Sequence, residues 1–310
     1  MNNQKIDISI IIVSYNSFEV LKNCLKTLIE YSKEFNYEII IVDNNSTEGN
    51  VRIITDQFEN IILIQNNENL GFAKANNQGL NIAKGEYILY LNNDMVFTHN
   101  CILDVLNYSK SDNKPKMIGC KLLNYDGSHQ VSIDKFDTIW NTLAISLFLY
   151  LVFPKSSLFN KYNLNYSDIT KPTDVESLKG AFLLAPKDCL LKLNGFDENF
   201  FFYGEEKDLC YRFKKIGEVI YYPLTSIIHL EGSSTKKAQW FKYKNQTLSK
   251  IIFFKKRYKG IDFFLILMFH ELGILLRIPV YFLGGILRFN TDLFLKSYYY
   301  FKQLFTYPKI

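Results

Sequence analysis

The sequence predicts an α/β fold: a mostly parallel sheet flanked by helices, followed by a C-terminal basic and apolar helical appendage. Over the first 110 residues, strand-like runs alternate with helix-like segments through short links, as in sheets built from strand–helix–strand units. The run Ile8–Val13 is almost continuously β-branched, which is typical of a strand buried on both faces. Beyond residue 235 the composition becomes basic and apolar. At 310 residues with 48% hydrophobic residues, the chain can form one large domain with an appendage.

Each element of the first half follows from its own pattern. The expected strands are Ile8–Val13, Tyr37–Val42, Ile61–Gln65 and Glu86–Leu91. Between the first two strands, Phe18, Leu21, Leu25 and Leu28 recur at helical spacing. Between the last two, Gly71–Lys84 predicts a helix with a face of small residues.

The second half predicts further elements. Thr98 is expected to cap a helix that runs to about Ser109. Two strands, Met117–Leu123 and Gln130–Ile133, are expected to flank an Asp126-Gly127 turn. The elements expected after them are a strand in Asp174–Ala185, a helix over Glu205–Ile216 and a strand over Glu218–Tyr222.

The expected domains are 1–235 and 236–310, with an apolar insert at about 138–154 in the first. This insert is short for a membrane span and fits a buried or interfacial segment. The strongly apolar Ile261–Phe289 is interrupted by Asp262, His270, Glu271 and Arg277. Charges are costly at bilayer depth, so a pair of interfacial amphipathic helices is expected rather than a clean span.

Positive charge is concentrated near the C-terminal end. The net charge is +5, yet the acid-free stretch Gly232–Ile261 carries nine basic residues, so the remainder is net negative. Such a band suggests an anionic partner, either lipid headgroups or nucleic acid. A solvated helix face is the alternative. The neighbouring apolar segment favours an anionic membrane surface, and no nucleic acid is expected.

Several chemistries find no support. The five cysteines are scattered without a CxxC pair, which predicts reduced thiols and neither a zinc site nor a disulfide framework. There is no GxGxxG, Walker A, HExxH or GxSxG motif. Hydride transfer, P-loop hydrolysis, zinc proteolysis and serine hydrolysis are therefore not expected. Near Met1 there is no basic segment followed by a long apolar one, so a signal peptide is not expected.

Polar clusters follow the carboxyl ends of the predicted strands, the edge where open α/β sheets bind ligands. The clusters are Ser14-Tyr15-Asn16, Asp43-Asn44-Asn45, Asn66 to Asn69 and Asn92-Asn93-Asp94. Asp94 could hold a Mg²⁺ or Mn²⁺ bound to a diphosphate, or it could cap the following turn. Asp43 could contact a base or ribose, or form an Asx-turn.

Three acids, Glu205, Glu206 and Asp208, open the predicted helix. They could stabilise the helix N-terminus, or one of them could act as a general base. His229 follows a strand and, taken alone, is more typical of a hydrogen-bonded structural residue.

Together these segments resemble the inverting family 2 glycosyltransferases of the GT-A fold, in particular the rhamnosyltransferase-like branch of bacterial surface polysaccharide biosynthesis. The resemblance spans residues 8 to 229 and rests on six blocks in the family's order. They are Ile11-Ile12-Val13-Ser14-Tyr15-Asn16, Ile41-Val42-Asp43-Asn44-Asn45-Ser46, Asn69 to Gly79, Leu91-Asn92-Asn93-Asp94, Gly195 to Phe201, and Tyr203 to Arg212 together with His229.

The resemblance implies a role for each site residue. Contacts with the nucleotide sugar are implied for Ser14, Tyr15, Asn16, Asp43, Asn45, Asn69, Gly71, Ala75, Asn76, Asn92 and Asn93. Asp94 matches the last acid of the family's Asp-x-Asp metal motif, and His229 a position that can complete the metal shell. Glu206 matches the catalytic base, with Glu205 and Asp208 as alternates. The metal motif lacks its first acid here, and the base is Glu where the family has Asp.

The implied function is inverting transfer of a sugar from a nucleotide-diphosphate donor, such as a dTDP- or UDP-sugar, to a hydroxyl of a lipid-linked saccharide. The implied location is the cytoplasmic face of the cell membrane. A sugar-phosphate nucleotidyltransferase or a non-catalytic membrane-associated binding protein are the alternatives. A processive synthase would need several clean spans and a Q-x-x-R-W motif, which the sequence lacks.

Overall fold

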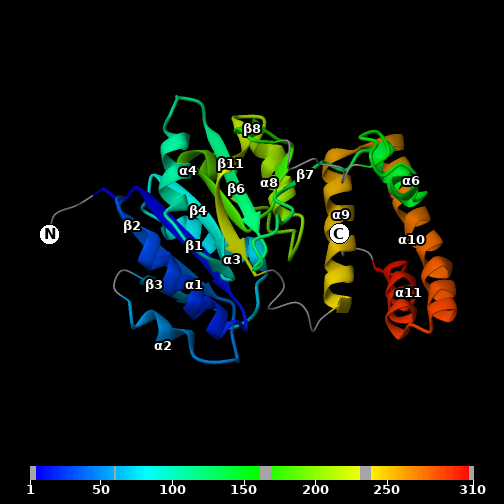
Figure 1. Ribbon diagram of the computed structural model, residues 1–310, viewed down its shortest axis with the longest axis horizontal. Helices are drawn as coiled ribbons and strands as arrows, with labels where there is room; N and C mark the ends of the chain where they lie inside the picture. The colour runs from blue at the N-terminus through cyan, green and yellow to red at the C-terminus, as the bar shows by residue number, and fades with distance from the viewer. Residues whose placement is uncertain (1–4, 59–60, 161–168, 231–238, 307–310) are drawn as a thin grey trace. The chain divides into compact units, whose positions relative to one another are not determined.

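The computed structural model describes residues 5–58, 61–160, 169–230 and 239–306 of the chain (Figure 1). It forms two compact units. Unit 1 comprises Met1–Asp134, Ser167–Phe201 and Glu205–Lys236, and unit 2 comprises Lys135–Tyr166, Phe202–Gly204 and Lys237–Ile310. The apolar segment at 138–154 therefore belongs to unit 2 with the C-terminal helices. The domain boundary at residue 235 stays a prediction.

Unit 1 is built on a mixed sheet. The strands of its parallel core are β1 (Ile8–Ser14), β2 (Tyr37–Asp43), β3 (Ile61–Gln65) and β4 (Tyr87–Asn92). They lie in the order β3-β2-β1-β4, and all their neighbouring pairs are parallel. β1 is fully buried except at Val13, as its unbroken apolar run predicts.

The sheet continues beyond β4 with β10 (Phe182–Pro186), β6 (Lys116–Leu123), β11 (Glu218–His229) and β5 (Met95–Val96), while β8 (Thr173–Asp174) pairs with β11. β10 runs antiparallel to β4, and β11 runs parallel to β6. A bulge between Tyr222 and Ser226 resets the register of β11 on β6. β7 (Ile133–Asp134) and β9 (Ser177–Leu178) pair separately.

Helices flank this sheet (Figure 1). Those of unit 1 are α1 (Phe18–Tyr31), α2 (Val51–Thr55), α3 (Phe72–Ile82), α4 (Cys101–Ser109), α7 (Lys187–Lys192) and α8 (Glu205–Phe213). The small-residue face predicted for α3 lies on the sheet: a Cβ on Gly79 would come within 2.6 Å of the Ile11 side chain. The main core is formed by the inward faces of β1, β4, α1 and α4.

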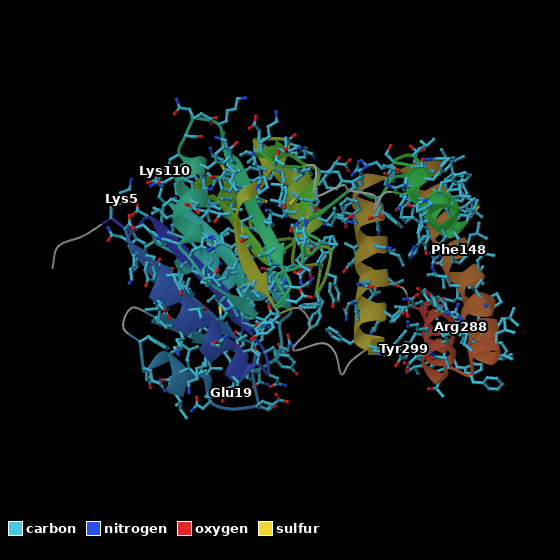
Figure 2. All side chains as sticks on the ribbon, viewed as in Figure 1. Lys5, Glu19, Lys110, Phe148, Arg288 and Tyr299 are labelled. Atoms are coloured by element: carbon cyan, nitrogen blue, oxygen red, sulfur yellow. The ribbon has the colours of Figure 1, made fainter. Side chains whose placement is uncertain are left out.

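Unit 2 is helical in its described residues. It contains α5 (Ile139–Ser146), α6 (Leu149–Val152), α9 (Gln239–Arg257), α10 (Gly260–Arg288) and α11 (Thr291–Gln303). Figure 2 labels Phe148, which has a φ of 57° and separates α5 from α6, and Arg288 in the last turn of α10. By length and composition, α10 could cross a membrane, and within the described part of the chain no other helix passes that test.

The structure corrects several predictions. Asn100, not Thr98, caps α4 by accepting a hydrogen bond from the Leu103 amide. The expected strand Gln130–Ile133 is wrong, because β7 begins only at Ile133. It pairs antiparallel with β9, which lies about 45 residues later in the sequence. Residues 174–185 form parts of three short strands instead of one. Ile261–Phe289 forms one long helix where a pair was expected, since the interrupting Asp262, His270, Glu271 and Arg277 do not break helical hydrogen bonding.

The four strands of the parallel core were predicted to within one residue at each end, and the Asp126-Gly127 turn is confirmed, with Gly127 at a φ of 80°. All five cysteines are free, and all five are buried.

Candidate active site

Sheet register brings the first two polar clusters together. Ser14 at the end of β1 lies opposite Asp43 at the end of β2, and Asp43 lies opposite Gln65 of β3. Asn16, at a φ of 48°, accepts a hydrogen bond from the Thr47 amide at 2.7 Å through its Oδ1 atom. The loops after β1 and β2 are therefore tied to one another at the carboxyl edge of the sheet.

Asp43 does form the Asx-type turn considered above. Its carboxylate accepts hydrogen bonds from the amide and the hydroxyl of Ser46, and the residue is only 5% exposed. By contrast, Tyr15 is 42% exposed and Asn45 is exposed at a φ of 65°. This contrast leaves Tyr15 and Asn45 as the accessible members of this half of the edge.

The third cluster forms the entry to α3. Asn69 Oδ1 accepts a hydrogen bond from the Gly71 amide, and Asn44 Nδ2 donates to the Gly71 carbonyl. Gly71 has a φ of 84°, and a Cβ there would lie 2.5 Å from the Phe201 carbonyl oxygen. The position thus requires glycine for both its backbone conformation and its close contact.

Two predicted nucleotide contacts lie inside α3. Ala75 is fully buried, and the side-chain amide of buried Asn76 donates to the Phe72 carbonyl one turn earlier. Contact of these two residues with the nucleotide therefore stays a prediction.

The fourth cluster lies where β4 ends. Asn93 Nδ2 donates to Ser17 Oγ at 2.7 Å, and Ser17 Oγ lies 3.2 Å from Ser14 Oγ. Asn92 Nδ2 lies 3.3 Å from His229 Nε2. Ser17, which sequence reasoning missed, connects the first and fourth clusters.

Asp94 and His229 form a buried pair. Met95 of β5 lies opposite His229 of β11, and the Leu230 amide donates to the Asp94 carbonyl. This pairing sets Asp94 Oδ1 at 3.2 Å from His229 Nε2, and both side chains are about nine-tenths buried. Each residue was predicted separately from its own motif, and the antiparallel β5–β11 contact brings the two together.

Gln130 fixes the orientation of the His229 ring. Its Nε2 atom donates to the Asn124 side chain and to the His229 carbonyl, so its Oε1 atom faces His229 Nδ1 at 2.6 Å. Nδ1 therefore carries a hydrogen. Nε2 then faces Asp94 either as an N–H or with its lone pair. Sequence reasoning placed Gln130 in a strand and missed this contact.

The pair fits a divalent cation. A carboxylate oxygen and an imidazole Nε2 in neighbouring positions are both metal ligands, and the Gln130 contact supplies the orienting hydrogen bond that such histidines have. Among residues 5–58, 61–160, 169–230 and 239–306 no group of three His, Cys, Asp or Glu side chains could hold a metal. Further ligands would have to come from substrate or water.

The three acids of α8 have distinct surroundings. Asp208 accepts a hydrogen bond from Arg212 Nε at 2.7 Å, and that guanidinium also donates to the Leu193 and Gly195 carbonyls. Burial and the nearby Glu206 carboxylate raise the pKa of Glu205 well above its usual value. Glu205 Oε2 is buried and has no hydrogen-bond partner among the residues that the structure describes. Glu206 is partly exposed.

Glu206 lies at the same sheet edge as Asp94. Its side chain packs beside Gly180, where an added Cβ would lie 3.3 Å away. The next residue, Ala181, accepts a hydrogen bond from the Asn92 amide through its carbonyl. The chain of contacts from Glu206 thus leads to the strand end that carries Asp94.

Comparison with known proteins supports the predicted resemblance. Residues 9–150 match the model of glycosyl transferase family 2. The predicted resemblance to this family is confirmed over that segment. It is 32% identical over 177 residues to the poly(ribitol-phosphate) beta-glucosyltransferase of Bacillus spizizenii, covering 55% of this chain and 27% of that protein. It is 27% identical over 229 residues to the rhamnosyltransferase WbbL of Escherichia coli, covering 71% and 82% of the two chains.

Solved structures show the same fold. A mannosyltransferase of Pyrobaculum calidifontis, in complex with GDP-Man and Mn²⁺, matches 98% of this chain and 87% of its own with a TM-score of 0.57 at 12% identity. The expected GT-A fold is thereby confirmed. The chain spans about a quarter of the Bacillus relative and most of the Escherichia one.

Proposed function

We propose that this protein is an inverting glycosyltransferase that moves a sugar from a nucleotide-diphosphate donor to a hydroxyl of a saccharide acceptor. The observation that carries the proposal is the buried Asp94–His229 pair at the carboxyl edge of a family 2 fold, with Glu206 on the same edge. The donor would lie along the strand ends from Asp43 to Asp94. A dTDP- or UDP-sugar is the proposed donor.

Glu206 is the proposed general base. Asp208 is paired with Arg212, and burial raises the pKa of Glu205, which favours its protonated form. A protonated carboxyl cannot accept the acceptor's proton. Glu206 is partly exposed at the helix start and is therefore accessible to an acceptor.

The proposed reaction is a single displacement. Glu206 takes the proton of the acceptor hydroxyl, and the oxygen forms a bond to the anomeric carbon. The bond from that carbon to the diphosphate breaks on the opposite face, so the configuration inverts and a nucleoside diphosphate leaves.

Asp94 and His229 would hold the Mg²⁺ or Mn²⁺ that binds the donor diphosphate, and the bound cation would offset charge on the leaving group. The Pyrobaculum enzyme was solved in complex with Mn²⁺, which supports a divalent cation as the cofactor of this protein.

Unit 2 is proposed to bind an anionic membrane surface on the cytoplasmic side, where a lipid-linked acceptor would be found. Exposed lysines at 242, 244, 255 and 259 supply positive charge, and α10 exposes apolar residues along its length, among them Phe264, Leu275 and Phe282. Basic and apolar residues on neighbouring helices are typical of interfacial binding.

The test is a panel of nucleotide sugars, each assayed with Mn²⁺ or Mg²⁺ and a lipid-linked acceptor. Release of nucleoside diphosphate that depends on the acceptor supports the proposal. Release of pyrophosphate would instead indicate a nucleotidyltransferase. If no donor in a broad panel is turned over or hydrolysed, the enzymatic proposal is wrong.

A further inference from the structure

A polar cavity lies within unit 2, formed by residues of that unit alone. Its volume is about 190 Å³, several times the roughly 30 Å³ that one water molecule takes in the liquid. Its lining comes from the segment at Asp137 and from α5, α9, α10 and α11. None of the predicted donor or metal residues belongs to it.

The helix α10 presents one face to this cavity and another to its surroundings. His270, Gly273, Ile274 and Arg277 line the cavity with the i, i+3, i+4, i+7 spacing of a single helix face. Met268, Leu275 and Phe282 follow each other at seven-residue intervals, and each is at least 41% exposed. The same helix therefore has one apolar face that is exposed and another face that lines the cavity with His270 and Arg277.

Positive charge predominates in the cavity. Its described charged lining residues are Lys250, Arg277 and Asp137. Arg277 is held in place, because Nη1 donates to the Gly273 carbonyl and Nη2 to the Ile145 carbonyl, and the guanidinium lies 4.8 Å from the Phe148 ring centroid (Figure 2 labels Phe148). Two of its five N–H groups thus donate to backbone carbonyls. Because these acceptors are uncharged, the two hydrogen bonds do not neutralise the positive charge of Arg277.

Two buried polar atoms of the lining have no hydrogen-bond partner among the described residues. They are Thr142 Oγ1 and His270 Nε2. Burial lowers the pKa of His270 to about 3; Lys250 and Arg277 act in the same direction and Asp137 in the opposite one, so the ring is neutral at pH 7. Buried polar atoms are normally paired, so these two call for a partner inside the cavity.

We propose that this cavity binds a phosphoryl group. A tetrahedral group with several oxygens suits a cavity whose polar lining side chains come from different helices, here Thr142 of α5, Lys250 of α9 and His270 of α10. The exposed apolar face of α10 makes a membrane phospholipid headgroup one source of this group, and free phosphate or pyrophosphate is the other. The proposal is independent of the transferase reaction.

The test compares two charge-matched variants of the full-length protein, Lys250→Gln in the cavity and Lys22→Gln, an exposed lysine of α1 that does not line it. In detergent solution, binding of inorganic phosphate and of pyrophosphate is measured by calorimetry. Lys250→Gln should weaken binding at least about tenfold, the size of one charge-assisted hydrogen bond, while Lys22→Gln leaves it unchanged.

A second arm measures flotation with vesicles of an uncharged galactolipid containing either phosphatidic acid or an anionic sulfolipid. If the source is a lipid, phosphatidic acid should be preferred, and Lys250→Gln should reduce that preference while Lys22→Gln leaves it unchanged. Binding of free phosphate without this effect would identify the soluble source.

Thr142→Val keeps the side-chain volume and removes one donor, so it should weaken phosphoryl binding about fivefold even if Lys250→Gln fails to fold. The proposal is overturned if neither probe binds, or if the two lysine variants behave alike in both arms.

Discussion

At the scale of single residues, the orientation of the His229 ring depends on one neutral amide. Gln130 is itself held by Asn124 and by the His229 carbonyl, so its oxygen cannot turn away from Nδ1 without losing two hydrogen bonds. The orientation of a proposed metal ligand thus rests on a residue with no charge and no motif.

Replacing Gln130 tests this arrangement. Gln130→Leu should raise the Mn²⁺ concentration needed for half-maximal transfer by 10- to 100-fold, the usual cost of removing such a partner. Gln130→Glu, which keeps the acceptor oxygen, should retain much of the affinity. Equal effects of both variants would show that packing, and not the acceptor, is what His229 needs.

Asp94 belongs to the same scale. Asp94→Asn removes the proposed anionic ligand, so donor binding and turnover should fall together, with turnover lower by about 10²–10³. Titration calorimetry with the donor and a nucleotide-release assay give the two quantities. Asp126→Asn, the same change in an exposed turn, should leave both unaltered.

The two neighbouring glutamates predict opposite results. Glu206→Gln should reduce transfer by about 10²–10⁴, as expected for loss of a general base, while Glu205→Gln should transfer sugar almost normally, since Gln resembles a protonated Glu. The reverse outcome would move the base to Glu205.

Stability gives an independent check on Glu205. Its pKa is raised in the folded state, so the folded protein binds more protons than the unfolded one above the ordinary carboxyl pKa. The free energy of unfolding that Glu205 contributes is fully present below the ordinary carboxyl pKa. It is lost as the pH rises through the raised pKa of the folded state. Glu205→Gln should therefore stabilise the protein increasingly with rising pH in urea unfolding. A difference from wild type that does not change with pH would contradict the buried, protonated state.

At the scale of elements, the entry to α3 joins a strained backbone to a close contact. Gly71→Ala should destabilise the protein by about 1–3 kcal/mol, since φ is positive and the Phe201 carbonyl oxygen occupies the Cβ position. Gly127 has a similar φ of 80° with no atom within 4 Å of an added Cβ. Gly127→Ala should cost only the backbone strain, and thermal unfolding of the two variants separates the contact from the strain.

The same scale shows what the sequence could predict. β1 to β4 are continuous apolar runs in sequence order, so local pattern defined them. The pairing of β7 with β9 and the antiparallel contact of β5 with β11 join segments about 45 and 130 residues apart, and a two-residue strand has no periodicity to read. The Asp94 and His229 positions were therefore predictable from motifs, while the Gln130 contact was not, because it depends on tertiary pairing.

At the scale of the whole molecule, the chain combines a sheet-based unit with a helical unit whose surface is basic and apolar. Vesicle binding by unit 2 should fall as ionic strength rises, because a Lys near an anionic surface contributes about 1 kcal/mol that salt screens. Replacing Lys242, Lys244 and Lys255 with Gln should weaken binding about fivefold per residue to anionic vesicles and leave binding to uncharged ones unchanged. Salt-independent flotation would show that apolar insertion acts alone.

The bulge in β11 has a consequence for how this chain tolerates changes in length. Residues 223–225 lie between two paired stretches of the strand, so the register is set separately on each side of them. A deletion within residues 223–225 can be absorbed locally. A single deletion at Ile227 or Ile228 would instead turn His229 to the opposite face of the sheet, away from Asp94. A protein engineer can thus lengthen or shorten the middle of this strand, but its last three residues are fixed in number.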